Sequence, residues 1–293
     1  MGVSEKRVTV PAIREMKGNQ RIGMLTAYDY PTARTVDAAG ADITLVGDSL
    51  GMVVLGYSDT LAVTMDDMLH HLKAVVRGTS RALVVADMPY LSYHISIEES
   101  VRNAGAFIQA GAHAVKIEGG KDSRLRTIEA ILDAEIPVMG HIGLTPQSVN
   151  AFGGFKIQGK STAEGKRLID EALLLEDAGC FSLVLECVPA EVAAFITERV
   201  SIPTIGIGAG PACDGQVLVF HDVVGLYEGK QPKFVRRYAE LAEEMRGALG
   251  RFLDDVREER FPDVATESFH TGTDDELRRL YGLPEIVPAT ESK

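Results

Sequence analysis

The chain has 293 residues, of which 45% are apolar and 25% are charged, as is typical of a soluble globular protein. Its net charge of −12 and pI of about 5.1 argue against nucleic acid or an anionic membrane surface as a bulk partner, because both would repel it. A small anionic substrate stays compatible with this charge, since one lysine and a metal ion can reverse the field locally.

The cysteines and the N-terminal sequence indicate a cellular compartment. Cys180, Cys187 and Cys213 lack the spacing of a zinc site, and an odd number of cysteines is a poor disulfide framework. We therefore expect reduced thiols and a cytoplasmic location. The first residues contain no apolar core of signal-peptide length, and no stretch approaches the ~18 apolar residues of a membrane helix.

Eight short apolar runs alternate with longer amphipathic stretches along the chain. The runs are rich in Val and Ile, as buried parallel strands are, and cover 22–28, 43–49, 82–89, 114–120, 136–143, 182–188, 202–210 and 216–225. Helical patterns lie between them, at 65–77, 96–110, 122–134 and 163–178. Eight strand–helix units favour a closed (β/α)₈ TIM barrel, whereas counting alone leaves an open doubly wound sheet as an alternative.

The C-terminal part of the chain has a different character. A long helix is predicted over 233–257, and the following residues are polar and punctuated by proline. We therefore predict a barrel catalytic domain over residues 1–258 and a loosely ordered tail over 259–293, with one helical turn around 274–281.

Acidic and histidine side chains stand at the C-terminal ends of five predicted strands, where barrel enzymes carry their chemistry. They are Asp48, Asp87, Glu118, His141 and Glu186. Four carboxylates that converge on one rim either take up protons or need a cation between them. Oxygen ligands suit Mg²⁺, which is held by a few carboxylates together with water and substrate.

Strand alternation turns a lysine toward the same rim. In 114–118, Val115 and Ile117 face one side of the strand, and Lys116 and Glu118 face the other. Because the apolar pair would pack under helices, Lys116 would point into the barrel and could bind a substrate carboxylate. A 2-oxo acid could chelate Mg²⁺, which would stabilise the enolate formed when a carboxylate on the opposite side removes the C3 proton.

The same residues also have a structural interpretation. A single aspartate at a strand end is commonly a helix N-cap or a turn residue, which could apply to Asp48 and Asp87, and Glu186 could cap a following helix. His141 alone fits a structural hydrogen bond as well as a ligand role. Five such residues at five strand ends favour the functional interpretation.

Two glycine-rich segments imitate nucleotide-binding motifs. Residues 154–161 match the P-loop pattern G-x-x-x-x-G-K-[ST], but no strand leads directly into them, so we predict a loop over the barrel mouth. Residues 206–210 (GIGAG) misplace the third glycine of a dinucleotide fingerprint, and a tight turn near a ligand is the better interpretation.

Several motifs together resemble the ketopantoate hydroxymethyltransferase (3-methyl-2-oxobutanoate hydroxymethyltransferase) family. They are LVGDSLGMVVLGY (45–57), ADMP (86–89), VKIEGG (115–120), GHIGLTPQ (140–147), the loop 153–160, Leu185-Glu186, GIGAG (206–210) and CDGQ (213–216). The resemblance extends from about residue 8 to about residue 251. Nothing transfers to the tail beyond about residue 260.

The resemblance implies a TIM barrel of the phosphoenolpyruvate-binding type and the first committed step of pantothenate, and hence coenzyme A, biosynthesis. The substrate would be 3-methyl-2-oxobutanoate, with 5,10-methylenetetrahydrofolate as the one-carbon co-substrate. The family is typically decameric, so we expect a homo-oligomer.

The same resemblance assigns roles to residues. Those implied for Mg²⁺, partly through water, are Asp48, Asp87 and Glu118. Those implied for the 2-oxo acid are Asp48, Ser49, Asp87 and Lys116, with His141 in a supporting role in the pocket. Glu186 matches the family's proton acceptor.

Two alternatives to this function remain. One is a carbon–carbon lyase of the isocitrate-lyase type, although the sequence has no loop motif of the K-K-C-G-H kind. The other is a catalytically silent barrel acting as an assembly subunit, although Glu186 and the metal carboxylates are all present.

Overall fold

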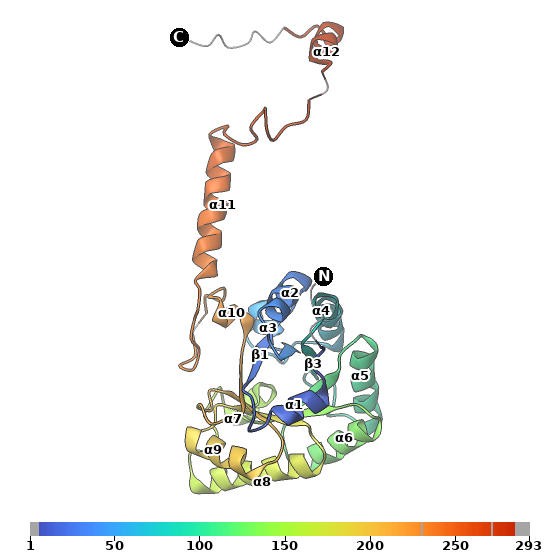
Figure 1. The fold of residues 1–293 in the computed structure, drawn as a ribbon, viewed down its shortest axis with the longest axis vertical. Helices are drawn as coiled ribbons and strands as arrows, with labels where there is room; N and C mark the ends of the chain where they lie inside the picture. Colours follow the sequence, from blue (N-terminus) through green and yellow to red (C-terminus); the bar gives the residue numbers. More distant parts are fainter. Residues whose placement is uncertain (1–5, 230, 271, 285–293) are drawn as a thin grey trace. The chain divides into compact units, whose positions relative to one another are not determined.

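The computed structural model describes residues 6–229, 231–270 and 272–284, and its first part is a closed eight-stranded barrel (Figure 1). All neighbouring strands pair in parallel, and the last pairs with the first to close the ring. The strands are β1 (Ile22–Thr26), β2 (Ile43–Val46), β3 (Leu83–Asp87), β4 (Ala114–Glu118), β5 (Val138–Gly143), β6 (Ser182–Glu186), β7 (Thr204–Ile207) and β8 (Gly215–Leu218). The TIM-barrel prediction is confirmed, and the open sheet is wrong.

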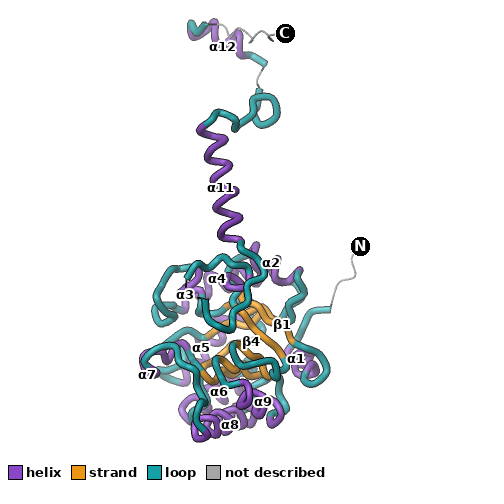
Figure 2. The backbone as a smooth tube through the Cα atoms, turned by 90° about the vertical axis from the view of Figure 1, so that its left-hand side faces the viewer, coloured by secondary structure: helices purple, strands orange, loops and turns teal. Residues whose placement is uncertain are grey.

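Helices connect the strands and surround them (Figure 2). They are α1 (Val10–Met16), α2 (Tyr30–Ala38), α3 (Leu50–Val53), α4 (Met65–Gly78), α5 (Ile97–Gln109), α6 (Asp122–Asp133), η1 (Pro146–Ser148), α7 (Val149–Phe152), α8 (Thr162–Asp177), α9 (Ala190–Arg199) and α10 (Phe220–Val223). Capping boxes at Asp29, Thr64 and Ser161 fix the starts of α2, α4 and α8 by satisfying their free N–H groups.

Two apolar clusters follow from the alternation of side chains along the strands. The inner cluster fills the barrel with side chains such as Met24, Val85 and Met139. The outer cluster contains Val115 and Ile117, which pack with helix residues as predicted. Val8 and Ile13, at the start of the chain, join the inner cluster, so apolar packing closes the N-terminal end of the barrel. We therefore expect the polar, functional side chains at the C-terminal end of the barrel.

Two predicted elements differ most from the observed bounds. The expected strand 216–225 ends at Leu218, because the chain turns into α10 where the Phe220 N–H donates to Thr26 Oγ1 over 2.8 Å. The expected helix over 233–257 starts only at residue 241. Before it, Val235 is buried and the Tyr238 N–H donates to the Val223 carbonyl over 2.8 Å, so tertiary contacts override the local helical pattern.

The contacts divide the chain into two compact units, residues 1–240 and 241–293. The second unit contains α11 (Leu241–Arg257) and α12 (Asp274–Tyr281), and α12 confirms the predicted helical turn. The catalytic domain over 1–258 stays a prediction, and the part of the predicted tail at 285–293 lies outside the described residues.

No helix in the described part of the chain is both long and apolar enough to cross a bilayer. Cys180, Cys187 and Cys213 are free thiols.

Gly143, at the end of β5, permits a close approach between two strands. Its φ is +98°, and a Cβ there would lie 2.7 Å from Val188 Cγ2 and would also collide with the Glu186 carbonyl. We predict that Gly143→Ala lowers the free energy of unfolding by about 3 kcal/mol, from backbone strain and overpacking together. Denaturant titration measures this loss.

Gly56→Ala is the matched control, because Gly56 also has a positive φ, +75°, but its added Cβ would meet nothing within 4 Å. It should lose only about 1 kcal/mol, from strain alone. Equal losses in the two variants would contradict the close approach at Gly143.

Candidate active site

The predicted site residues gather at the C-terminal mouth of the barrel. Asp87, Glu118 and Glu186 are the last residues of β3, β4 and β6. Lys116 and His141 lie inside β4 and β5, and β5 ends at Gly143, the predicted last residue of that strand. Asp48 and Ser49 follow β2, and Ser49 precedes α3 without making a side-chain cap.

These side chains form one connected series of charged contacts. Lys116 Nζ lies 2.9 Å from Asp87 Oδ1 and 3.2 Å from His141 Nδ1. His141 Nδ1 is 3.3 Å from Glu118 Oε1, and its Nε2 is 3.2 Å from Glu186 Oε2. Glu186, with 17% of its side chain exposed, is the member of the series most open to solvent. The structure thus brings the predicted residues together.

The charged forms of two aspartates, Asp48 and Asp87, are unfavourable in the site. Burial, followed by the negative charges of Asp87 and Glu118, raises the pKa of Asp48 well above its usual range. Burial also raises the pKa of Asp87, although the ammonium of Lys116 opposes this. The Asp48 N–H donates to Asp87 Oδ2 over 3.1 Å and holds the two residues together. The site therefore favours an added positive charge.

In the other members of the series, the charged partners outweigh burial and favour the charged form of each group. Burial lowers the pKa of Lys116, but the surrounding carboxylates outweigh it, so the pKa is raised above its ordinary value. Burial raises the pKa of Glu118, yet His141 and Lys116 lower it further than burial raises it. Burial and Lys116 lower the pKa of His141, but Glu118 and Glu186 turn the net shift upward. Lys116 therefore stays an ammonium in the resting site.

The carboxylate oxygens of Asp48, Asp87 and Glu118 suit a hard cation, but their arrangement restricts how many of them can bind it directly. Asp87 Oδ1 is a buried oxygen with no aligned hydrogen-bond donor in the described parts of the chain. No three His, Cys, Asp or Glu side chains among the described residues are arranged to enclose a metal ion directly. Mg²⁺ commonly takes only one or two protein carboxylates and keeps several waters, so Asp48 and Asp87 fit it with Glu118 behind water.

Sequence reasoning missed two residues that organise this cluster. Gln147, in η1, donates to Asp48 Oδ2 over 2.8 Å, and its own backbone N–H donates to Glu118 Oε2 over 3.1 Å. Tyr93, in the β3–α5 loop, donates to Gln147 Oε1 over 2.6 Å. Gln147 ends the quoted GHIGLTPQ motif, but no periodicity or spacing marks Tyr93.

Ser49 is placed by a close contact with the loop that follows β1. Its Oγ lies 2.8 Å from the hydroxyl of Tyr28, which is fully buried. Gly47 makes room for this contact, because a Cβ there would lie 2.8 Å from Ser49 Oγ and 3.4 Å from Asp87 Oδ2. The hydroxyl therefore faces the same mouth as the aspartates and can donate to an anionic ligand.

Neither of the two described glycine-rich segments connects a strand to a helix, as the nucleotide-binding motifs that they imitate require. Residues 154–161 follow α7 rather than a strand, and Ser161 caps α8, so the P-loop geometry is absent from this described segment. The Gln158 N–H donates to the Cys187 carbonyl over 3.0 Å, which attaches this loop beside Glu186, as a loop over the mouth requires. Gly208 and Gly210 have positive φ values and form the predicted tight turn after β7.

The sequence matches known proteins over almost its whole length. A model of the family described as ketopantoate hydroxymethyltransferase matches residues 7–264. The chain belongs to this family. The 3-methyl-2-oxobutanoate hydroxymethyltransferase of Syntrophomonas wolfei is 57% identical over 277 residues, which are 94% of this chain and 99% of that relative. The Moorella thermoacetica protein of the same name is 57% identical over 88% of this chain and 96% of its own. The chain is thus an enzyme of the transferase class.

Solved structures of more distant proteins share the fold. A phosphonopyruvate hydrolase in complex with oxalate and Mg²⁺ is 14% identical, with a TM-score of 0.58 over 93% of this chain and 94% of that chain. A 2,3-dimethylmalate lyase, of the PEP mutase/isocitrate lyase superfamily, has a TM-score of 0.55 at 17% identity over 94% of this chain and 95% of its own. At such identities the likeness concerns the fold, and it agrees with the predicted phosphoenolpyruvate-binding type of barrel.

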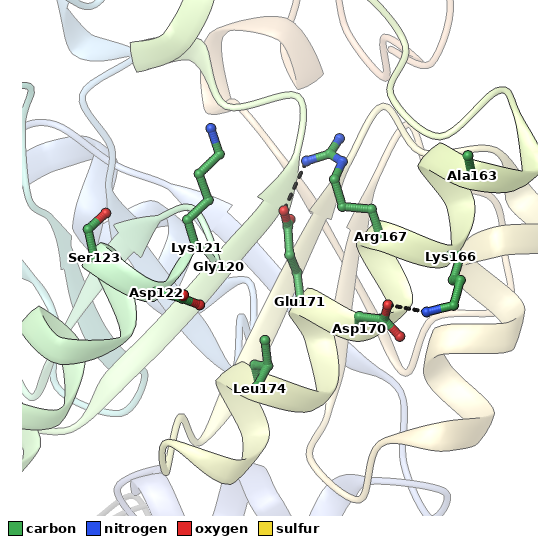
Figure 3. A pocket seen from close by; sticks show the side chains of 10 residues that line it. All are labelled: Gly120, Lys121, Asp122, Ser123, Ala163, Lys166, Arg167, Asp170, Glu171 and Leu174. Atoms are coloured by element: carbon green, nitrogen blue, oxygen red, sulfur yellow. Dashed lines mark hydrogen bonds and ion pairs between the residues drawn. The ribbon is translucent and has the colours of Figure 1, made fainter.

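A separate groove of about 600 Å³ lies between the start of α6 and α8 (Figure 3). Its charged side chains on α8 pair with one another, Lys166 with Asp170 over 2.6 Å and Arg167 with Glu171 over 2.9 Å. The lining includes none of the predicted site residues.

The raised pKa of Asp48 predicts a stabilising substitution. A carboxyl whose pKa is raised by folding contributes stability below its unfolded value, about 3.9, that is lost as the pH rises through the folded pKa. In EDTA at pH 8, Asp48→Asn should therefore raise the free energy of unfolding, because the amide brings no charge into the buried site. The gain should vanish near pH 4, and denaturant titrations at both pH values measure it.

Asp37→Asn is the control at another buried aspartate. Burial raises the pKa of Asp37, but hydrogen bonds from Ala82, Ser80 and Arg81 outweigh burial and lower it. This substitution should destabilise the protein at pH 8 by about 1–3 kcal/mol. A loss of stability in Asp48→Asn under the same conditions would contradict the electrostatic strain assigned to the mouth.

Proposed function

We propose that the enzyme transfers a hydroxymethyl group from 5,10-methylenetetrahydrofolate to 3-methyl-2-oxobutanoate and so forms 2-dehydropantoate, in pantothenate biosynthesis. The observation that carries this proposal is the buried cluster of Asp48, Asp87 and Glu118 around Lys116 at the barrel mouth. Relatives 53–57% identical to this chain bear the name of that activity.

Asp48 and Asp87 are the proposed direct ligands of Mg²⁺, and Glu118 is a ligand through water. When bound, the ion would supply positive charge that stabilises the enolate form of the 2-oxo acid. Asp87 is held by Lys116 and by the Asp48 N–H, so its carboxylate is oriented before any ligand arrives. This preorganisation supports the assignment.

Lys116 and Ser49 are the proposed binding groups for the substrate carboxylate. Lys116 stays protonated because three carboxylates surround it, which makes it a permanent cation inside the mouth. Ser49 has a hydroxyl that Tyr28 orients from the loop after β1. A cation on β4 and an oriented hydroxyl after β2 fix the direction in which the substrate lies.

Glu186 is the proposed base that removes the C3 proton. It lies on β6, across His141 from Glu118, and more of its side chain is exposed than that of the other charged groups in the cluster. His141 Nε2 lies 3.2 Å from Glu186 Oε2, so the other oxygen of Glu186 is the one proposed to face the substrate. Water first hydrolyses the methylene bridge of the folate, breaking both C–N bonds to give formaldehyde and tetrahydrofolate. The enolate carbon then attacks the formaldehyde carbon, and the formaldehyde oxygen takes up a proton to become the hydroxyl group of 2-dehydropantoate.

We further propose that the enzyme is a cytoplasmic homo-oligomer, a decamer by family resemblance. The three free thiols support the compartment. Self-association is supported by α11, where Met245, Leu249, Phe252, Leu253 and Val256 are all exposed. At 100° per residue these side chains share one face of the helix, and such a face is typical of a protein interface.

Glu186→Gln tests the role of the base. The variant should still bind 3-methyl-2-oxobutanoate, but Mg²⁺-dependent exchange of its C3 hydrogen with D₂O should slow by at least about 100-fold, since the proton acceptor is lost. Proton NMR follows the exchange and requires no folate. Glu171→Gln, in the groove on α8, should exchange like the wild type. Undiminished exchange in Glu186→Gln would remove Glu186 from this role.

Leu249→Lys tests the α11 face, because a charge in an apolar interface is strongly unfavourable. Light scattering coupled to size exclusion should give a lower mass than for the wild type, by at least about a factor of two if Leu249 lies in the interface. Glu243→Lys introduces the same side chain on the opposite side of α11 and should keep the wild-type mass. Equal masses for all three proteins would contradict the proposed interface.

A further inference from the structure

The side chain of Gln147 uses both N–H donors and its acceptor oxygen at the edge of the carboxylate cluster. Its Nε2 donates to Asp48 Oδ2 over 2.8 Å and to the Met88 carbonyl over 2.9 Å, and its Oε1 accepts from the Tyr93 hydroxyl over 2.6 Å. Two donors and one strong acceptor in fixed directions allow a single orientation of this buried amide. Gln147 is therefore a rigid support rather than a mobile polar side chain.

The backbone of Gln147 extends the support to a second carboxylate. Its N–H donates to Glu118 Oε2 over 3.1 Å, while the Glu118 N–H donates to the Tyr93 hydroxyl over 3.3 Å. Gln147, Tyr93 and Glu118 thus form a closed ring of hydrogen bonds. Gln147, from the connection between β5 and α8, thus sets the position of Asp48, which follows β2, and of Glu118, which ends β4.

Tyr93 is itself held from outside the mouth. The Arg124 guanidinium lies 4.3 Å from the centre of its ring, and Arg124 Nη1 donates to the Tyr93 carbonyl over 2.8 Å. The ring also lies beside that of His94, with 4.2 Å between centroids. The support of Gln147 is therefore anchored in α6 and the β3–α5 loop, independently of the carboxylates that it orients.

We propose that Gln147 is a positioning residue, which holds the Asp48 carboxylate so that Oδ1 faces the ligand. Its contact with Oδ2 leaves Oδ1 without a hydrogen-bond donor in the described part of the chain. Without the amide, repulsion from Asp87 would favour rotation of the Asp48 carboxylate away from the mouth. This inference rests on the proposed Mg²⁺ and 2-oxo acid function.

Gln147→Met tests the proposal, because it keeps the length of the side chain and the backbone N–H to Glu118 but removes the amide. The probe is Mn²⁺, whose binding to the protein is followed by electron paramagnetic resonance without any turnover. Outer groups that orient metal ligands typically contribute 10–100-fold in metal affinity, so the dissociation constant for Mn²⁺ should rise by about that factor. Metal-dependent C3–H exchange should need correspondingly more metal for half its maximal rate.

Tyr93→Phe is the second variant, and it removes the hydroxyl that fixes the Gln147 amide and accepts from the Glu118 N–H. It should weaken Mn²⁺ binding by less than Gln147→Met does, and its loss should be smaller in the Gln147→Met background than in the wild type, because its effect on Asp48 passes through the Gln147 amide. A loss that adds fully in the double variant would overturn this shared action.

Ile131→Val controls for general destabilisation, since it removes one buried methyl group from α6, away from the mouth. It should leave Mn²⁺ affinity unchanged, even where its melting temperature falls as far as that of Gln147→Met. Wild-type Mn²⁺ affinity in both folded Gln147→Met and folded Tyr93→Phe would overturn the positioning role while leaving the proposed function intact. A wild-type protein that neither binds Mn²⁺ nor exchanges C3–H would overturn both.

Discussion

The rest of the site depends on an unbalanced burial of charge at one end of a closed barrel. Asp48, Asp87 and Glu118 are all buried around the single ammonium of Lys116. Removing charges from water is expensive unless they are paired, so this excess of negative charge opposes folding. The apolar interior below the mouth, closed by Val8 and Ile13, supplies stability that can tolerate it. We interpret the imbalance as a site prepared for a further cation.

The register of the parallel strands explains why the proposed metal carboxylate Glu118 and the proposed base Glu186 both lie close to His141. Glu118 on β4 stands opposite His141 on β5, and Gly143 on β5 stands opposite Glu186 on β6. His141 therefore contacts the carboxylate before it in the ring through Nδ1 and the carboxylate after it through Nε2. Gly143 keeps β5 and β6 close enough for this arrangement, because any larger residue would meet the Glu186 carbonyl.

Most of the fold, and the positions of the charged residues in the site, could be predicted from the pattern of apolar strands. The apolar runs located all eight strands, and the alternation of Val115, Lys116 and Ile117 gave the direction of the lysine without coordinates. Where the pattern was misleading, tertiary contacts decided. The segment before α11 is helical by composition but is tied to α10 through Tyr238, and the predicted β8 is cut short by the turn at Phe220.

The supporting groups of the site could not be derived in the same way. Gln147 and Tyr93 lie on connections, where no hydrophobic period reports which way a side chain points. Gln147 was visible only as the last letter of a family motif, and its contact with Asp48 joins residues 99 positions apart. Such contacts depend on the conformation of the loops, and that conformation is determined by packing in the folded protein rather than by the local sequence.

The most direct test is a crystal structure of the enzyme with Mg²⁺ and 3-methyl-2-oxobutanoate. The account predicts one ion with oxygens of Asp48 and Asp87 at about 2.0–2.1 Å, the usual Mg²⁺–oxygen distance. Glu118 should contact a water on that ion, and the substrate carboxylate should lie at Lys116 and Ser49. An ion held elsewhere, or a 2-oxo acid bound at the mouth with no ion between it and the aspartates, would contradict the central claim.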